Sequence, residues 1–179
     1  MDTDRVGGLD VARFGDDESA FVIREGNRVV LAETWHGKDT MWTCGRVKAS
    51  GVHVNVDVIG IGAGVVDRLL EQEYPCAGIN LAEAASASDR FCNQRAELYW
   101  NLRERFRMGE ISLAEMPSEL YERLVGELTA IKYGYDSAGR IRVEDKGEIK
   151  KRLGRSTDLA DALVLAFAPV PGPLIAFVV

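Results

Sequence analysis

The stretch Arg152-Leu-Gly-Arg-Ser-Thr-Asp-Leu-Ala-Asp-Ala-Leu-Val-Leu-Ala-Phe-Ala168 decides the fold. From Leu159 to Phe167 it carries apolar side chains on every side, and a helix without a polar face belongs in a protein core. Asp161 interrupts this run and Asp158 precedes it by one turn, so both acids lie on the same side of the helix. A buried, ionised carboxylate is unfavourable unless a cation or hydrogen bonds meet it. Because two acids share one face, a divalent cation that prefers oxygen ligands is the simplest common partner.

A helix cap is the alternative interpretation of this acid pair. Ser156, Thr157 or Asp158 could cap the helix, and acids in a first turn are favoured by the helix dipole. A cap accounts well for Asp158. It accounts for Asp161 only if the helix begins as late as Asp158.

Length and composition indicate one soluble domain. The chain has 179 residues, enough to bury a sizeable core, and its net charge of -6 argues against a generally basic nucleic-acid binder but not against a local basic patch. Its three cysteines are widely spaced without a CxxC motif, which favours reduced thiols over disulfides or a zinc site. No signal peptide is recognisable. The apolar tail at 171–179 is too short to span a bilayer, and we expect it to lie outside the core.

The order of predicted elements indicates an α/β fold. Strand patterns come first, at 5–12, 19–24 and 28–34, the last two joined by the hairpin signal Glu25-Gly-Asn27. Later patterns alternate: helix 38–50, strand 52–59, helix 65–73, strand 77–80, helices 90–108 and 117–131, a hairpin over 133–144, and the last helix. This order predicts a mixed sheet of three antiparallel strands and then parallel strands, flanked by helices, in a single domain over residues 1–170.

The glycine-rich segment Gly60-Ile-Gly-Ala-Gly64 follows a strand and opens a helix, as nucleotide-binding turns do. The dinucleotide fingerprint needs a third glycine where this chain has Val65, and the chain contains no P-loop motif. We therefore interpret the segment as a tight strand-to-helix turn beside Asp57.

Four acids remain as a candidate site. Asp10 closes the first strand and Asp57 the fourth, while Asp158 and Asp161 lie on the last helix. If the first and fourth strands are parallel neighbours, both strand ends meet at one edge of the sheet, where open α/β folds place their sites. Taken singly, Asp10 and Asp57 could be turn formers, whereas Asp16, Asp17 and Asp67 are more typical of solvated positions. Three acids that each interrupt an apolar segment favour a shared site.

Four motifs, in this order and spacing, carry a resemblance to a known family. They are the hairpin strands with Asp10, then Val56-Asp-Val-Ile-Gly-Ile-Gly-Ala-Gly-Val-Val-Asp-Arg-Leu69, then Asn93-Gln-Arg-Ala-Glu-Leu-Tyr-Trp100, then Ser156-Thr-Asp-Leu-Ala-Asp-Ala162. The chain resembles the C-terminal nuclease domain of bacteriophage large terminase subunits, which has the RNase H-like fold shared with Holliday-junction resolvases. The resemblance covers the chain from Val6 to Ala168. Thr157 departs from it, because many relatives carry proline there, which is harmless at a helix start.

The resemblance implies a metal-dependent endonuclease that cuts double-stranded viral DNA during genome packaging. It makes Asp10, Asp57 and Asp161 the catalytic residues, and Asp158 joins them as a metal ligand. Two Mg²⁺ or Mn²⁺ ions suit a site made only of carboxylates, and two such ions can hold the attacking water and the leaving oxygen of an in-line displacement. In this hypothesis Asp10 bridges the two ions.

Basic residues just ahead of the last helix are the candidate DNA-binding set: Lys146, Lys150, Lys151, Arg152 and Arg155. A solvated basic helix face is the alternative for each of them. The resemblance further implies three partners besides DNA: an ATPase motor domain, a small terminase subunit and a portal. It places the chain in the cytoplasm of the host bacterium, without a membrane. The motor that precedes this domain in the family is missing here, so we expect an excised fragment or a separately encoded piece.

Three other functions are considered. A different RNase H-like nuclease, such as a junction resolvase, would share the acids. A non-catalytic docking module of a packaging motor would share the fold but need no carboxylate cluster. An ATP-handling relative of actin and the sugar kinases is excluded, because it needs two such domains and phosphate-binding glycine turns.

Overall fold

The computed structural model describes residues 5–12 and 18–170. Asp16 and Asp17, considered above as solvated acids, and the tail at 171–179 lie outside the described residues. The described elements are, in chain order, β1 (Arg5–Asp10), β2 (Ser19–Glu25), β3 (Arg28–Trp35), α1 (Thr40–Ser50), β4 (His53–Asp57), α2 (Gly62–Glu71), β5 (Cys76–Ile79), α3 (Gln94–Arg107), α4 (Ser118–Ala130), β6 (Tyr133–Tyr135), β7 (Ile141–Val143), α5 (Lys146–Leu153) and α6 (Asp158–Phe167).

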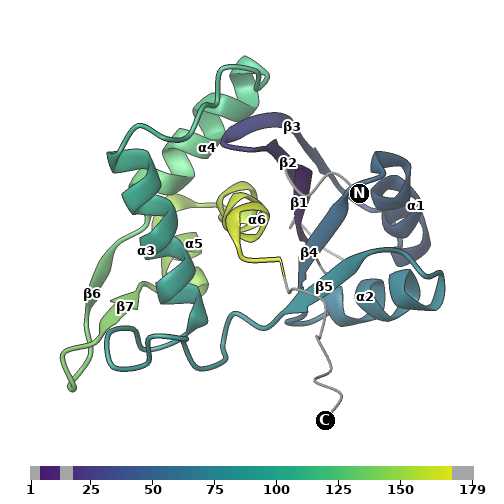
Figure 1. Ribbon diagram of the computed structural model, residues 1–179. Coiled ribbons are helices and arrows are strands. Elements are labelled where there is room, and N and C mark those ends of the chain that lie inside the picture. Colours follow the sequence, from purple (N-terminus) through teal and green to yellow (C-terminus); the bar gives the residue numbers. More distant parts are fainter. Residues whose placement is uncertain (1–4, 13–17, 171–179) are drawn as a thin grey trace, which may run out of the picture.

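The central sheet has five strands in the order β3-β2-β1-β4-β5 (Figure 1). The strand β2 pairs antiparallel with both β1 and β3, whereas β4 pairs parallel with β1 and with β5. The predicted mixed sheet, with three antiparallel strands and then parallel ones, is therefore confirmed, as is the expected parallel pairing of the first and fourth strands. Because β1 and β4 are parallel neighbours, Asp10 and Asp57 come to the same edge of the sheet.

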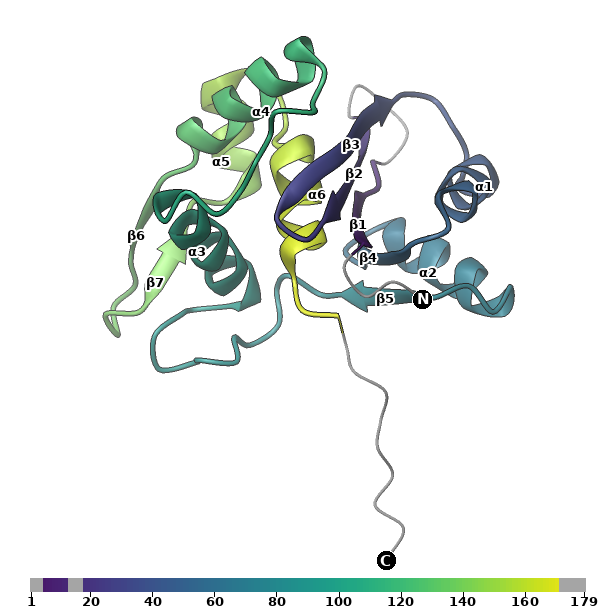
Figure 2. The same cartoon turned by 45° about the horizontal axis from the view of Figure 1, so that its top comes forward.

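Helices cover both faces of this sheet. One face carries α1 and α2, and the other carries α6, with α3, α4, α5 and the β6–β7 hairpin outside it (Figures 1 and 2). Two separate apolar clusters fill the layers. One joins α6 to α3, α4 and the sheet, and the other joins α1 and α2 to the opposite face.

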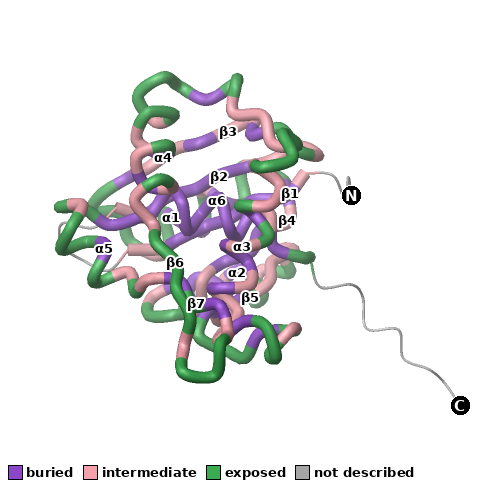
Figure 3. The backbone as a smooth tube through the Cα atoms, turned by 90° about the vertical axis from the view of Figure 1, so that its left-hand side faces the viewer, coloured by how far each residue is buried: buried purple, intermediate pink, exposed green. Residues whose placement is uncertain are grey.

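The helix α6 lies at the centre of the molecule, and its residues from Asp158 to Ala166 are all buried (Figure 3). Its backbone rests directly on β1, because Gly8 has no side chain to hold it off. A Cβ atom at Gly8 would stand 2.0 Å from the carbonyl oxygen of Ala162 and 2.2 Å from the amide nitrogen of Ala166. The predicted core helix is thus confirmed, and one glycine sets its distance from the sheet.

Side chains from the sheet bind the free carbonyl groups at the C-terminal end of α6. The amide of Asn55, on β4, donates to the carbonyl oxygens of Leu165 at 2.9 Å and Ala168 at 3.3 Å. The guanidinium of Arg24, on β2, donates to that of Ala166 at 2.6 Å. These bonds satisfy acceptors that a helix end leaves without an internal partner.

Two helices differ from the sequence prediction. The helix expected at 90–108 begins only at Gln94, because the Asn93 side chain caps it by accepting from the amide of Ala96 at 2.9 Å. Helix α5 was not among the predicted elements, although a basic helix face was considered for its lysines. Its only buried residue is Ile149, so it has no apolar stripe by which sequence periodicity could reveal it. No helix in the described ranges has the length and apolar character that crossing a bilayer requires.

We expect Gly8→Ala to lower the free energy of unfolding by about 3 kcal/mol or more, because the new methyl group meets helix backbone that cannot rotate away. Urea titration of the purified protein measures this. Gly45→Ala is the matched control, since Gly45 lies in α1 with no heavy atom within 4 Å of its added Cβ. There the exchange should stabilise by up to about 1 kcal/mol. Equal stability of the two variants would contradict the proposed contact.

Candidate active site

Three carboxylates converge on one ammonium group where β1, α5 and α6 meet. The Nζ atom of Lys146, at the start of α5, lies 2.7 Å from Asp10 Oδ2, 3.1 Å from Asp158 Oδ1 and 3.0 Å from Asp161 Oδ2. The three acids are buried, whereas the Lys146 side chain keeps 38% of its surface exposed. A single cation therefore balances three buried acids and is reached from solvent.

Asp57 stands at the same sheet edge, one strand away. Its Oδ1 atom accepts a hydrogen bond from the amide of Ile59 at 2.9 Å, which holds the carboxylate in its own turn. Burial raises its pKa, and the charge of Asp161 adds to this effect. A Cβ atom at Gly62 would stand 1.7 Å from the carbonyl oxygen of Asp57, so this glycine lets α2 begin directly against the strand end. The structure thus agrees with the tight strand-to-helix turn expected at this segment.

Asp161 is the most heavily bonded of the acids. The hydroxyl of Tyr99 donates to its Oδ1 atom at 2.6 Å, and the hydroxyl of Thr157 donates to Oδ2 at 3.0 Å. The Arg95 Nη2 atom lies 3.8 Å from Oδ1. Burial alone would raise the pKa of Asp161, but the charges of Lys146 and Arg95 and the Tyr99 hydrogen bond outweigh it and hold the pKa below its ordinary value. Asp161 is therefore kept ionised inside the core.

Helix α3 supplies the groups that hold Asp161. The Arg95 guanidinium stacks over the Tyr99 ring, 4.8 Å from its centroid, and its Nη1 atom donates to the carbonyl oxygen of Glu144 at 2.7 Å. Burial and the neighbouring carboxylate of Asp161 raise the pKa of Tyr99 well above its ordinary value. The phenol therefore stays protonated and remains a donor.

Different causes raise the pKa values of Asp10 and Lys146. Burial raises the pKa of Asp10 to about 7 despite the opposing charge of Lys146, and the charges of Asp161 and Asp158 push it the same way. Burial would lower the pKa of Lys146, but the three carboxylates around it raise the pKa instead. Lys146 is thus fully charged, whereas Asp10 is only partly ionised near neutral pH in the metal-free protein.

The acids fit a divalent cation because they already surround a monovalent one. Among the described residues, no three acids, histidines or cysteines are arranged as a ready-made metal site, and the ammonium occupies the space between the acids. Asp10, Asp158 and Asp161 offer only oxygen atoms, the ligand type that Mg²⁺ and Mn²⁺ prefer. Replacement of the ammonium by such an ion would exchange one positive charge for two.

The other four candidate DNA-binding residues lie apart from the acids, on and after α5. All four are exposed, and all four are engaged by other groups in the structure. Lys151 pairs with Glu148 at 2.7 Å, and Arg152 donates to the carbonyl oxygen of Ala130 at 2.6 Å. Arg155 Nη2 donates to the carbonyl oxygen of Arg123 at 3.5 Å, and Lys150 is also engaged. Of the five candidate DNA-binding residues, only Lys146 contacts the acids among the described residues.

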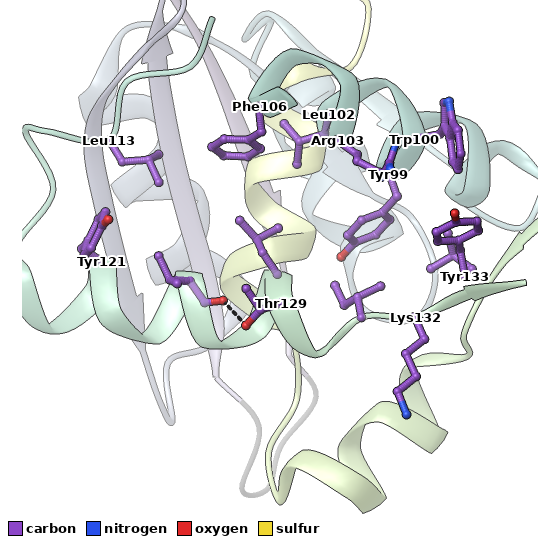
Figure 4. A pocket seen from close by; sticks show the side chains of 14 residues that line it. Tyr99, Trp100, Leu102, Arg103, Phe106, Leu113, Tyr121, Thr129, Lys132 and Tyr133 are labelled. Atoms are coloured by element: carbon purple, nitrogen blue, oxygen red, sulfur yellow. Dashed lines mark hydrogen bonds between the residues drawn. The ribbon is translucent and has the colours of Figure 1, made fainter. Parts of the chain in front are cut away.

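A cavity of about 420 Å³ lies on the far side of Tyr99, between α3, α4 and β6 (Figure 4). Its lining is mostly apolar, with Phe106 from α3 and Tyr121 from α4 on its walls, and none of its lining residues is acidic. The cavity therefore borders the acid cluster through Tyr99 without sharing its carboxylates.

The fold is that of large terminase nuclease domains. The nuclease domain of the large terminase subunit gp2 of bacterial virus Sf6 is 23% identical and matches with a TM-score of 0.83, over 94% of this chain and 89% of that one. A second structure of that domain, with one lysine replaced by alanine, contains manganese and beta-thujaplicinol and matches equally well. The large terminase nuclease of thermophilic phage G20c with bound magnesium matches at 18% identity with a TM-score of 0.67, covering 90% of this chain and 79% of that one.

The resemblance inferred from sequence motifs is thus confirmed at the level of the fold. No protein-family model matches the sequence, and no curated protein matches it significantly.

Sequence reasoning found the acids but missed the groups that hold them. Tyr99 and Arg95 were quoted only as members of a motif, and Thr157 was considered only as a helix cap and as a departure from the family. Lys146 was grouped with residues for DNA, although the structure places it among the carboxylates. A buried acid needs a partner, but nothing in the sequence shows which of the many basic residues supplies it.

We expect Asp10→Asn to stabilise the metal-free protein at pH 8 and to leave its stability unchanged near pH 3. The pKa of Asp10 rises from 3.8 to about 7 on folding. Each pKa unit corresponds to about 1.4 kcal/mol, so ionising Asp10 within the fold costs about 4 kcal/mol. A group whose pKa is raised on folding favours the native state at low pH, and this contribution is lost as pH rises from about 4 to 7. Urea titrations of both proteins in EDTA at a series of pH values measure the difference. If the two proteins differed in stability by the same amount at every pH between about 4 and 7, the prediction would be wrong.

Proposed function

We propose that this chain is a divalent-metal-dependent endonuclease that hydrolyses phosphodiester bonds of double-stranded DNA by a two-metal mechanism, and that it cuts concatemeric viral DNA during genome packaging. The observation that carries the proposal is the cation-centred cluster of Asp10, Asp158 and Asp161, beside Asp57, on the sheet edge of a terminase-like nuclease fold. The magnesium and manganese in the matched terminase structures support the same choice of ion.

In this proposal Asp10, Asp57, Asp158 and Asp161 would hold two Mg²⁺ or Mn²⁺ ions through their carboxylate oxygen atoms. When bound, such ions polarise a phosphoryl oxygen and lower the pKa of a water molecule, so that hydroxide forms near neutral pH. Tyr99, Thr157 and Arg95 keep Asp161 ionised and fixed in direction. The metal ions would also balance the negative charges of Asp10 and Asp158, which lie next to Asp161 around the same point.

Lys146 has two successive roles in this mechanism. In the metal-free protein its ammonium balances the acids, and its partly exposed side chain gives it a route out of the cluster. If a divalent ion balanced the carboxylates instead, the ammonium would be free to turn outward, toward the exposed Lys150, Lys151, Arg152 and Arg155. There it joins them in binding DNA phosphates, which is the role expected for it from the sequence.

The proposed partners follow from the same function. Double-stranded DNA is the substrate, and an ATPase motor domain, a small terminase subunit and a portal are the proteins with which the nuclease would work in the host cytoplasm. Because the chain is acidic overall, we expect weak DNA binding by this domain alone, with the motor holding the DNA.

We expect the purified protein to nick and linearise supercoiled plasmid with Mn²⁺ and to leave it intact in EDTA. Asp161→Asn and Asp57→Asn should each reduce cleavage by more than about 100-fold, beyond the loss typical for an outer partner of a metal site. Asp67→Asn is the control, because Asp67 is an exposed acid on α2. Gel electrophoresis of the plasmid measures all four proteins. Cleavage that persists in EDTA, or in both site variants, would refute the assignment.

We further expect Lys146→Ala to bind Mn²⁺ about 10-fold more tightly than the wild-type protein, because the ammonium no longer competes for the same oxygen atoms. In EDTA the variant should be less stable by about 2 kcal/mol. This is below the range for breaking a fully buried ion pair, since the lysine is partly exposed. Isothermal titration calorimetry and thermal unfolding with and without Mn²⁺ measure both effects.

The matched control for this experiment is Lys151→Ala, on the same helix but paired with the exposed Glu148. It should leave the Mn²⁺ affinity unchanged. If Lys146→Ala bound Mn²⁺ more weakly than wild type, the lysine would be supporting the site and not competing for it.

A further inference from the structure

A fourth buried acid, Glu127, lies outside the cluster, on α4. Glu127 is 0% exposed, and both of its oxygen atoms are engaged. Its Oε2 atom accepts from the backbone amide of Ala160 at 2.9 Å, and its Oε1 atom accepts from Nε of Arg123 at 2.9 Å. Arg123 in turn binds Glu18, so Glu127 is anchored on the side away from α6.

The bond to Ala160 places Glu127 at the N-terminus of α6. Ala160 belongs to the first turn of that helix, whose amides have no partner within the helix itself. Thr157 occupies the capping position and is a residue type that often supplies the cap. Its side chain makes no capping hydrogen bond, and its hydroxyl donates to Asp161. Glu127 on α4 therefore caps α6, and the Thr157 hydroxyl binds Asp161.

The capped turn is also the turn that carries the acids of the candidate site. Ala160 lies next to Asp161 and two residues after Asp158. A change in the direction of this turn would move both carboxylates together. Since a metal site depends on the angle at which its ligands enter, a group that fixes the turn also fixes the ligands.

We propose that Glu127 is a positioning residue for metal binding: by capping α6 from α4, it holds Asp158 and Asp161 in the orientation that a divalent ion requires. The inference rests on the proposed function, because it concerns the same site. Glu127 touches neither the ammonium nor the acids through a hydrogen bond in the described residues, so it acts through the helix backbone.

The test compares two replacements of Glu127 that are similar in size. Only one of them keeps an oxygen atom that can accept the hydrogen bond from Ala160. Glu127→Gln retains an oxygen atom that can accept from Ala160, whereas Glu127→Leu fills the space without one. Mn²⁺ affinity is measured by isothermal titration calorimetry on folded protein, with near-ultraviolet circular dichroism to verify packing. The matched control is Glu122→Gln, because Glu122 is exposed on the same helix.

We expect Glu127→Leu to bind Mn²⁺ about 10-fold or more weakly, as outer partners of metal sites do when removed. Glu127→Gln should remain within about 3-fold of wild type, since it retains the cap. If Glu127→Leu does not fold, Glu127→Asp replaces it. It keeps the charge but is one methylene too short to reach Ala160, so it must show the same loss.

Two results overturn the proposal in distinguishable ways. If the wild-type protein and all variants bind Mn²⁺ equally well, Glu127 has only a structural role and the proposed function stands. If the wild-type protein itself does not bind Mn²⁺, the proposed function fails, and the role of Glu127 fails with it.

Discussion

Asp10, Asp158 and Asp161 are buried around one point, and ionised groups so close together repel each other in a medium that screens them poorly. The arrangement is tolerable only with a cation between them, and Lys146 supplies it here. Several neighbouring groups help to balance these negative charges. Arg95 and Tyr99 act on Asp161 from α3, and the chain enters α5 at the point where the ammonium can reach the cluster. A site that can exist only around positive charge is well suited to bind metal ions.

The helix that carries two of these acids is positioned from outside itself. Glu127 binds its first turn, Asn55 and Arg24 bind its last carbonyl groups, and Gly8 allows its backbone to touch β1. Such a helix needs little intrinsic propensity, because its neighbours specify its ends and its depth. The same four contacts also set the distance between Asp10 on the strand and Asp161 on the helix.

The parts of this structure that sequence could predict are those with a local pattern. Alternation and turn residues gave the first three strands, and the unbroken apolar run gave α6 and the unusual position of Asp161. The mixed sheet followed from the order of these elements. Helix α5 could not be predicted, because a helix that buries only Ile149 leaves no periodic pattern.

The groups that hold the acids, directly or through the helix backbone, also depend on tertiary structure. Lys146 and Glu127 come from elements far from the first strand in sequence, and their side chains differ in no local way from the solvated lysines and glutamates around them. Only packing shows that one enters the cluster and the other caps a helix. The same holds for Tyr99. Its ring lies among the buried apolar residues of α3, and its hydroxyl binds Asp161.

The contact between Gly8 and α6 joins the first described strand to the last described helix, and this has a consequence for biosynthesis. During translation β1 leaves the ribosome long before α6, so the face of the sheet around Gly8 stays uncovered until the last helix emerges. Asp10 meanwhile lacks the two acids that complete its cluster. Contacts of such long sequence separation form late and slowly. The three acids can therefore surround Lys146 only after α6 has emerged and packed on β1, so the cluster is among the last parts of the fold to form.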